Sequence, residues 1–175
     1  NAGVFPTGQS GPITDNGVTT YELNVASSGQ IFDLVAFNLD INHTWVGDLT
    51  ITLEHAGTSV TLLDRPGVPE STVGNGADLA GVYTFVDGGS AWDNTPGAQS
   101  GVTVAPGAWG LDNDDGTTLA DFVGLDVNGV WTLTVTDAAQ LDTGVVNAWS
   151  FDIVPAPGAV TLFGVGAVAA TRRRR

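Results

Sequence analysis

The chain has 175 residues, of which 42% are hydrophobic, with Gly 24, Pro 8 and Cys 0. This length allows one domain with a sizeable core, and the apolar content is too high for a disordered acidic segment. The absence of cysteine excludes thiolate zinc sites, iron–sulfur clusters and cysteine nucleophiles.

The charge is strongly acidic, with 19 Asp and Glu residues against 5 Lys and Arg and a formal net charge of −14. Four of the cations are the last four residues, so Arg65 is the only one before them. Such a surface repels phosphate backbones and anionic lipid headgroups, and this excludes nucleic acid as a partner. Two explanations stay open: a solubility device in a saline habitat, and a surface neutralised by calcium.

Hydrophobic residues alternate with polar ones along most of the chain, which predicts β-strands with one buried face. In chain order the expected strands are residues 21–25, 35–41, 49–53, 59–63, 83–86, 131–135 and 149–153, with short strands near Val102 and Leu119. Asn-Gly, Ala-Gly and Asp-Gly pairs separate them, and no segment has a convincing helical period. Residues 1–154 are therefore predicted to form an all-β, jelly-roll-like antiparallel β-sandwich with Trp131 and Trp149 in its core.

The composition changes after Ile153. A proline-containing break is followed by an uncharged apolar run at 159–170 and by the terminal arginines. Twelve helical residues extend over about 18 Å, whereas a hydrocarbon core is about 30 Å thick, so transient membrane contact is expected rather than a stable span. Residues 155–175 are predicted to be a separate tail.

The three parts of this tail resemble the PEP-CTERM sorting signals of bacteria. The residues that carry the resemblance are Val154, Pro155, Ala156, Pro157, Arg172, Arg173, Arg174 and Arg175. Ala156 departs from the pattern, which usually has Glu there. The resemblance implies export, an exosortase-like processing enzyme as partner, and delivery to the surface or extracellular matrix of a bacterium.

The upstream domain resembles the P domain, or Homo B domain, of kexin- and furin-like subtilases. The segments that carry the resemblance are 41–49, 50–53, 57–58, 60–62, Phe122, 128–133, Asp137, 142–144 and Trp149. In that family the domain is a jelly roll that supports the folding and stability of a neighbouring protease. Ala56 departs from the pattern, which often has proline in this turn, and this implies an altered hairpin.

No catalytic residue is predicted, and the chain is not expected to be an enzyme. Gly57-Thr58-Ser59 looks like the nucleophile motif of subtilases, but that serine begins a helix, whereas a strand follows here. His43 and His55 lack the catalytic His-Gly-Thr-His context. We expect His43 to bond to backbone carbonyls as a structural residue and His55 to be exposed.

Calcium is the one cofactor that the sequence indicates. Asp48 opens an expected strand, Asp137 ends another, and Asp142 follows in a short turn, so the three could supply hard oxygen ligands to one ion. A second candidate set is Asp112, Asn113, Asp114 and Asp115, which lacks EF-hand spacing. The alternative is that these residues only cap turns on an acidic surface.

Trp92 and Trp109 fall in a pattern-poor stretch. They either stack on the sugar rings of an extracellular polysaccharide or cover the open end of the sandwich.

Three functions follow from these observations. The leading one is a non-catalytic secreted or cell-surface module, structural, adhesive or stabilising, that is processed through its sorting signal. The alternatives are an accessory P domain of a subtilisin-like serine protease system, with a protease domain as partner, and a carbohydrate-binding jelly roll.

Overall fold

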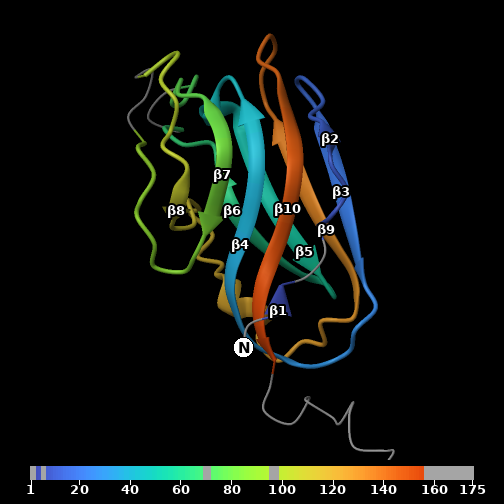
Figure 1. Ribbon diagram of the computed structural model, residues 1–175. Helices are drawn as coiled ribbons and strands as arrows, with labels where there is room; N and C mark the ends of the chain where they lie inside the picture. The colour runs from blue at the N-terminus through green and yellow to red at the C-terminus, as the bar shows by residue number, and fades with distance from the viewer. Residues whose placement is uncertain (1–2, 5–6, 69–71, 95–98, 156–175) are drawn as a thin grey trace, which may run out of the picture.

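The computed structural model describes residues 3–4, 7–68, 72–94 and 99–155, and every structural statement below refers to these. They form two packed β-sheets (Figure 1). The expected jelly-roll-like β-sandwich is therefore confirmed. The helical elements within this part of the chain are two short 3₁₀ turns, η1 (Val46–Asp48) and η2 (Leu119–Phe122).

The larger sheet has the strand order β1-β10-β4-β7-β8, and β2 also pairs with β10. All its pairs are antiparallel except β7 with β8. Its strands are β1 (Gly3–Val4), β2 (Gly11–Pro12), β4 (Ile31–His43), β7 (Leu79–Phe85), β8 (Gly107–Trp109) and β10 (Gly144–Pro155).

The smaller sheet is antiparallel throughout, in the order β3-β9-β5-β6. Its strands are β3 (Val18–Val25), β5 (Leu49–His55), β6 (Thr58–Asp64) and β9 (Gly129–Asp137). On β9 the buried residues alternate with half-buried threonines, as the period of two predicts.

Aromatic side chains join the two sheets. Trp131 on β9 of the smaller sheet lies with its ring centroid 4.3 Å from that of Phe151 on β10 of the larger sheet. Within the larger sheet, Trp149 on β10 lies 5.8 Å from Phe37 on β4. Trp131 and Trp149 are both almost fully buried, so the prediction that they lie in the core is confirmed. Each large ring removes about 150–250 Å² from water, which makes this layer a main source of hydrophobic stabilisation.

Three local predictions were wrong. Val35 was expected on the buried face, but the pairing of β4 with β10 shifts by one residue near Asp152, so Leu34 is buried and Val35 is exposed. Such a bulge reverses the alternation on one side of it. Leu119 begins the 3₁₀ turn η2 instead of a strand, and Val102 lies in a loop beside a single bridge.

The hairpin between β5 and β6 explains why Ala56 stands where the P-domain pattern often has proline. Ala56 has φ of 52° and Gly57 has φ of 83°, the left-handed conformations that a two-residue primed turn requires. Proline is locked near −65° and could not occupy the first of these positions.

The strand β10 includes Pro155, the first residue of the predicted tail. The rest of that tail, residues 156–175, lies outside the described residues, as do all its arginines. Within the described part of the chain, none of the helical segments has the length and apolar character needed to cross a bilayer.

Candidate functional site

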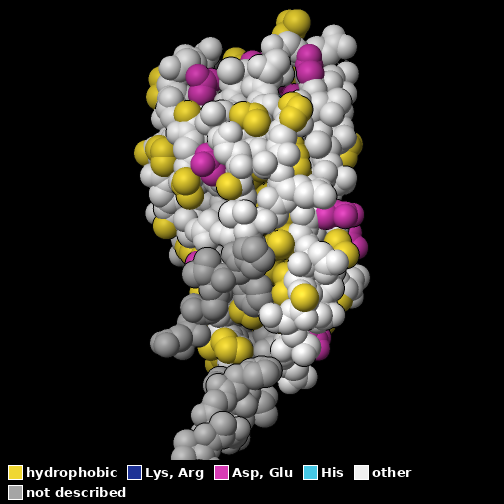
Figure 2. Space-filling view, turned by 45° about the vertical axis from the view of Figure 1, so that its right-hand side comes forward, with side chains coloured by type: hydrophobic (Ala, Val, Ile, Leu, Met, Phe, Trp, Pro, Cys, Tyr) yellow, Lys and Arg dark blue, Asp and Glu magenta, His cyan; other side chains and the backbone are white. Residues whose placement is uncertain are grey.

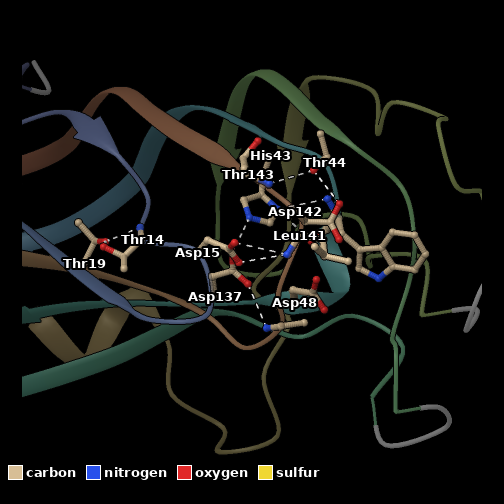
Figure 3. A network of polar contacts seen from close by, with 12 residues as sticks. Thr14, Asp15, Thr19, His43, Thr44, Asp48, Asp137, Leu141, Asp142 and Thr143 are labelled. Atoms are coloured by element: carbon tan, nitrogen blue, oxygen red, sulfur yellow. Dashed lines mark hydrogen bonds and ion pairs between the residues drawn. The ribbon is translucent and has the colours of Figure 1, made fainter.

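Four strand ends meet at one end of the sandwich and bring the predicted calcium residues into one neighbourhood. The strand β4 ends at His43, η1 leads to the start of β5, β9 ends at Asp137 and β10 begins at Gly144. Pairing places His43 opposite Gly144 and Leu49 opposite Asp137. We call His43, Asp48, Asp137 and Asp142 the His43 cluster (Figure 3).

His43 is the buried centre of this cluster. Its Nε2 lies 3.3 Å from Asp137 Oδ2, and its Nδ1 lies 3.2 Å from the backbone nitrogen of Trp45 and 3.1 Å from the carbonyl oxygen of that residue. Backbone carbonyls were expected as its partners, and the structure shows one carbonyl, that of Trp45, and one carboxylate, that of Asp137. Asp137 also accepts a hydrogen bond from Ala139 N at 3.1 Å.

Gly144 makes room for the imidazole. A Cβ at this position would lie 2.4 Å from His43 Cδ2 and 2.7 Å from the carbonyl oxygen of Asn42, closer than real contacts allow. Glycine at the start of β10 is therefore a requirement of the cluster, which the sequence shows only as an Asp-Thr-Gly turn.

Asp142 is fixed at the rim of the cluster. The hydroxyl of Thr44 donates to Asp142 Oδ1 at 2.8 Å and accepts from Thr143 N at 3.1 Å. Beside it, Asp15 accepts from Leu141 N at 3.2 Å, which holds the same turn to the N-terminal segment (Figure 3). Neither Thr44 nor Asp15 was singled out from the sequence.

Asp48 is buried close to two other carboxylates. Burial, and then the negative charges of Asp137 and Asp142, raise its pKa to about 6 from an ordinary value of 3.8. Arg65 and His43 act in the opposite direction, and Arg65 Nη2 lies 4.0 Å from Asp48 Oδ1. Arg65 also donates through Nε to Gly47 O at 3.1 Å.

The geometry is not that of a preformed metal site. Among the described residues, no group of three or more His, Cys, Asp and Glu side chains is arranged to hold a metal ion. In the His43 cluster, His43 contacts Asp137 and Thr44 contacts Asp142, so these ligands are engaged by the protein itself. Calcium would have to replace these contacts.

His55 was expected to be exposed, and this is wrong. It is 2% exposed and stacks on Trp131 with a centroid distance of 4.1 Å and an interplanar angle of 2°. Its ring nitrogens lie 2.9 Å from Val130 O and 2.7 Å from Asp126 O. The alternation of Leu49, Ile51 and Leu53 extends to position 55, and this signal could have predicted the burial.

The second acidic set holds a loop in place. Asp115 accepts from Thr117 Oγ1 at 2.7 Å, from Thr117 N at 2.8 Å and from Thr61 Oγ1 at 2.7 Å. These bonds lower its pKa, and that from the Thr117 hydroxyl has the largest effect. Asn113 donates to Thr61 O at 2.6 Å and to Thr117 O at 3.1 Å. The turn-forming interpretation accounts for both residues.

The serine of the nucleophile-like motif lies in a strand. Thr58 begins β6, and Ser59 pairs with Glu54 of β5, so Ser59 does not begin a helix. The buried histidine on this hairpin, His55, has both ring nitrogens at backbone carbonyls. This local geometry is not that of a subtilase nucleophile.

Acidic side chains are spaced over the face of the sandwich shown in Figure 2, and no Lys or Arg is seen among the described residues on that face. Fold and site together define a class: an acidic all-β sandwich module whose buried polar groups are engaged in structural bonds.

Parts of known proteins are similar to this chain in sequence. The family model of the proprotein convertase P-domain matches residues 104–153, and this domain is a non-catalytic part of its proteins. Calcium-dependent proteases of Trichormus variabilis and of a Nostoc species are each 27% identical over 154 residues, which cover 86% of this chain and 18% of theirs. The chain thus spans less than a fifth of the length of these curated relatives.

Among solved structures, the Aeromonas sobria serine protease in complex with a chaperone matches with a TM-score of 0.50 and 18% sequence identity. The match covers 87% of this chain and 27% of that chain. This similarity supports the fold. The P-domain match itself spans β8, η2, β9 and most of β10, and it includes Asp137 and Asp142.

Proposed function

We propose that this chain is a P-domain-like accessory module that stabilises a secreted bacterial serine protease and takes no part in the chemistry. The observation that carries the proposal is an alignment with curated proteases that covers 86% of this chain but only 18% of their length. The family model that matches within this chain is that of the P-domain. A module of this kind contributes through burial against its neighbour, which stabilises the folded protease.

The natural product of the gene tests this proposal. Mass spectrometry of the protein isolated from the organism should find this sequence in one polypeptide, or in a stable complex, with a subtilase domain. Deletion of residues 7–155 from that product should shorten the half-life of its protease activity at least tenfold. A product without any associated protease would contradict the proposal.

A second candidate is a stand-alone exported module of the surface or matrix, with structural or adhesive function. The order of the proline break, apolar run and Arg172–Arg175 supports it. An exosortase-like enzyme would process the tail during transient membrane contact. Detection of the mature protein in the matrix fraction, shortened near Pro155 and free of protease, would favour this candidate.

Calcium binding is compatible with either candidate function, and we propose Asp48, Asp137 and Asp142 as the calcium ligands. Burial, and then the charges of Asp137 and Asp142, raise the pKa of Asp48, so a divalent cation bound between the three carboxylates would offset this unfavourable charge. The curated relatives are named calcium-dependent proteases, which supports the choice of ion. The ion would neutralise the repulsion in the cluster and fix the turn between β9 and β10.

Titration of Ca²⁺ into the chelator-treated chain tests this assignment. A saturable heat and a raised melting temperature are expected, and both should be lost in Asp142→Asn. Asp33→Asn, at the opposite end of β4, is the matched control and should bind normally. An unchanged melting temperature in 10 mM Ca²⁺ would contradict the assignment.

A further inference from the structure

A cavity of about 230 Å³ lies beside β8, with an aromatic floor and a polar rim, and none of the four residues of the His43 cluster lines it. We propose that it binds a sugar ring of a neutral polysaccharide. This inference uses none of the proposed calcium ligands, and it does not depend on whether the chain serves a protease. The volume is below that of pockets for drug-sized ligands, which are about 300–1,000 Å³, and suits a single ring.

The floor is a stack of aromatic rings. Trp92 lies 5.0 Å from Trp109, 5.8 Å from Phe85 and 6.1 Å from Tyr83, measured between ring centroids. Trp92 is buried, whereas Trp109 is half-buried and lines the cavity. Of these four rings, Trp92 and Trp109 line the cavity and present an apolar surface to a ligand.

Both indole N–H groups are already used. Trp92 Nε1 donates to Gly110 O at 2.9 Å, and Trp109 Nε1 donates to Ala105 O at 3.1 Å. The floor thus offers only its carbon surface and the negative potential of the ring faces. The C–H face of a pyranose, with its partial positive charge, complements such a surface.

The rim supplies both hydrogen-bond donors and acceptors. Asp93, Gln99 and Thr103 line the cavity and are exposed, and the amide of Gln99 donates to the carboxylate of Asp93. Asn75 donates to Asp93 O at 2.6 Å and accepts from Ala77 N at 2.9 Å, which fixes the base of the rim.

This mixture selects the class of ligand. Sugar hydroxyls donate and accept, and they match a carboxylate, an amide and a hydroxyl together. An anionic sugar would be repelled by Asp93 and by the net charge of −14. A cationic side chain needs acceptors alone, and the charged acceptor on this rim, the carboxylate of Asp93, already accepts from the amide of Gln99.

The far wall is held in place without a ligand. Asp78 N donates to Val102 O at 2.8 Å, Val104 N donates to Asp78 O at 2.9 Å, and the hydroxyl of Tyr83 donates to Val104 O at 2.8 Å. Gln99 has φ of 70°, a left-handed conformation uncommon for residues other than glycine. A wall fixed in this way reduces the cost of ordering on binding.

Affinity electrophoresis of the intact chain tests the proposal. The gels contain laminarin, xyloglucan, galactomannan or dextran as neutral probes, alginate as the anionic probe, and an oligolysine peptide competes in solution as the cationic probe. At least one neutral polysaccharide should retard the chain, alginate should not, and oligolysine should not compete. Trp109→Ala should weaken retardation at least tenfold.

Two further variants separate binding from folding. Ala105→Leu fills the cavity while keeping both tryptophans and should also weaken retardation tenfold. Thr103→Val should weaken it about threefold, whereas Thr132→Val on the outer face of β9 is the matched control and should not. The same melting temperature in Ala105→Leu and the parent chain establishes that the fold is intact.

Retardation by no neutral polysaccharide would overturn the proposal. So would retardation that persists in both Trp109→Ala and Ala105→Leu, since the sugar would then bind elsewhere. Tight binding of oligolysine in place of the sugars would replace it with a docking site for a basic protein segment.

Discussion

The two ends of the sandwich each bury one histidine, and the contacts that hold the two rings differ. At the end of the sandwich where β5 begins, His43 contacts the carboxylate of Asp137. The charged side chains of Asp48, Asp142 and Arg65 lie nearby. At the β5 end, His55 stacks on Trp131 and its nitrogens face two backbone carbonyls. The first end depends on charges that protons or cations can change, whereas the second depends on packing and backbone geometry.

The same contrast appears in the carboxylates. Asp126 at the His55 end accepts from Asn128 N at 3.0 Å and Gly29 N at 2.9 Å, and these bonds lower its pKa. Asp48 at the other end has its pKa raised by burial and by like charges. The pKa values of these two carboxylates are therefore shifted in opposite directions, and the calcium proposed above would act at the end where the pKa is raised.

The largest effect is expected at the packed end. Trp131→Ala should lower the free energy of unfolding by about 4 kcal/mol, because it removes a fully buried indole that contacts His55, Phe122 and Phe151. Urea denaturation followed by circular dichroism measures this. Val130→Ala, whose side chain is 46% exposed on the same strand, should change it by less than about 1 kcal/mol. Similar losses in both would contradict the assignment of the core.

The next effect is expected at the charged end. His43→Ala should cost about 3 kcal/mol, because it leaves the buried carboxylate of Asp137 without its imidazole partner. The double variant with Asp137→Ala should lose much less than the sum of the two single losses. Strict additivity in this cycle, measured by urea denaturation, would show that the 3.3 Å contact contributes little.

The pH dependence of the free energy of unfolding distinguishes the charged end from the packed end. Because folding raises the pKa of Asp48 to about 6, the folded state keeps a proton between pH 4 and 6 that the unfolded chain has lost. The chain therefore loses stability as pH rises through this window. Asp48→Asn should escape that loss and be about 3 kcal/mol more stable at pH 7.5, since the pKa rises from 3.8 to about 6 and one pKa unit corresponds to about 1.4 kcal/mol.

Urea midpoints at pH 4, 5, 6 and 7.5 measure this difference, with Asp33→Asn as the control that should follow the parent chain. Parallel curves for the parent chain and Asp48→Asn would contradict the origin of the effect. Calcium should reduce the difference at pH 7.5, because the bound ion requires the ionised carboxylate.

These two ends also differ in how far the sequence predicted them. The alternation of Trp131, Leu133 and Val135 gave the core directly, because pairing in a sheet keeps the period of two. The neighbourhood of Asp48, Asp137 and Asp142 followed from their places at strand ends. The contact of Arg65 with Asp48 could not be predicted, since it depends on how a loop returns to the sheet.

Two misses have local causes. The bulge that exposes Val35 adds a residue on one strand only, and nothing in the alternation marks where it occurs. Leu119 and Phe122 are spaced by three, which fits a 3₁₀ turn, but two apolar residues are too few to establish a period.

A smaller effect tests whether backbone geometry holds the packed end. His55→Phe keeps an aromatic ring against Trp131 but removes both ring nitrogens. It should cost about 1–2 kcal/mol, because Val130 O and Asp126 O lose a buried partner. Urea denaturation of His55→Phe and of His55→Leu separates the two terms, since only the second variant also loses the stacking. Equal stability of His55→Phe and the parent chain would show that stacking alone fixes this end.

The smallest effect concerns how the packed end is supported from the loop after β7. Asp87 accepts from Leu119 N at 2.9 Å and from Ala120 N at 3.1 Å, and so caps the turn η2 that carries Phe122 against Trp131. Asp87→Ala should cost about 1 kcal/mol, as the loss of a capping carboxylate does elsewhere. Asp114→Ala, an exposed acidic neighbour in the next loop, removes the same charge without a cap and should be neutral. If both variants lower the urea midpoint equally, the effect is one of net charge and the packed end does not depend on its cap.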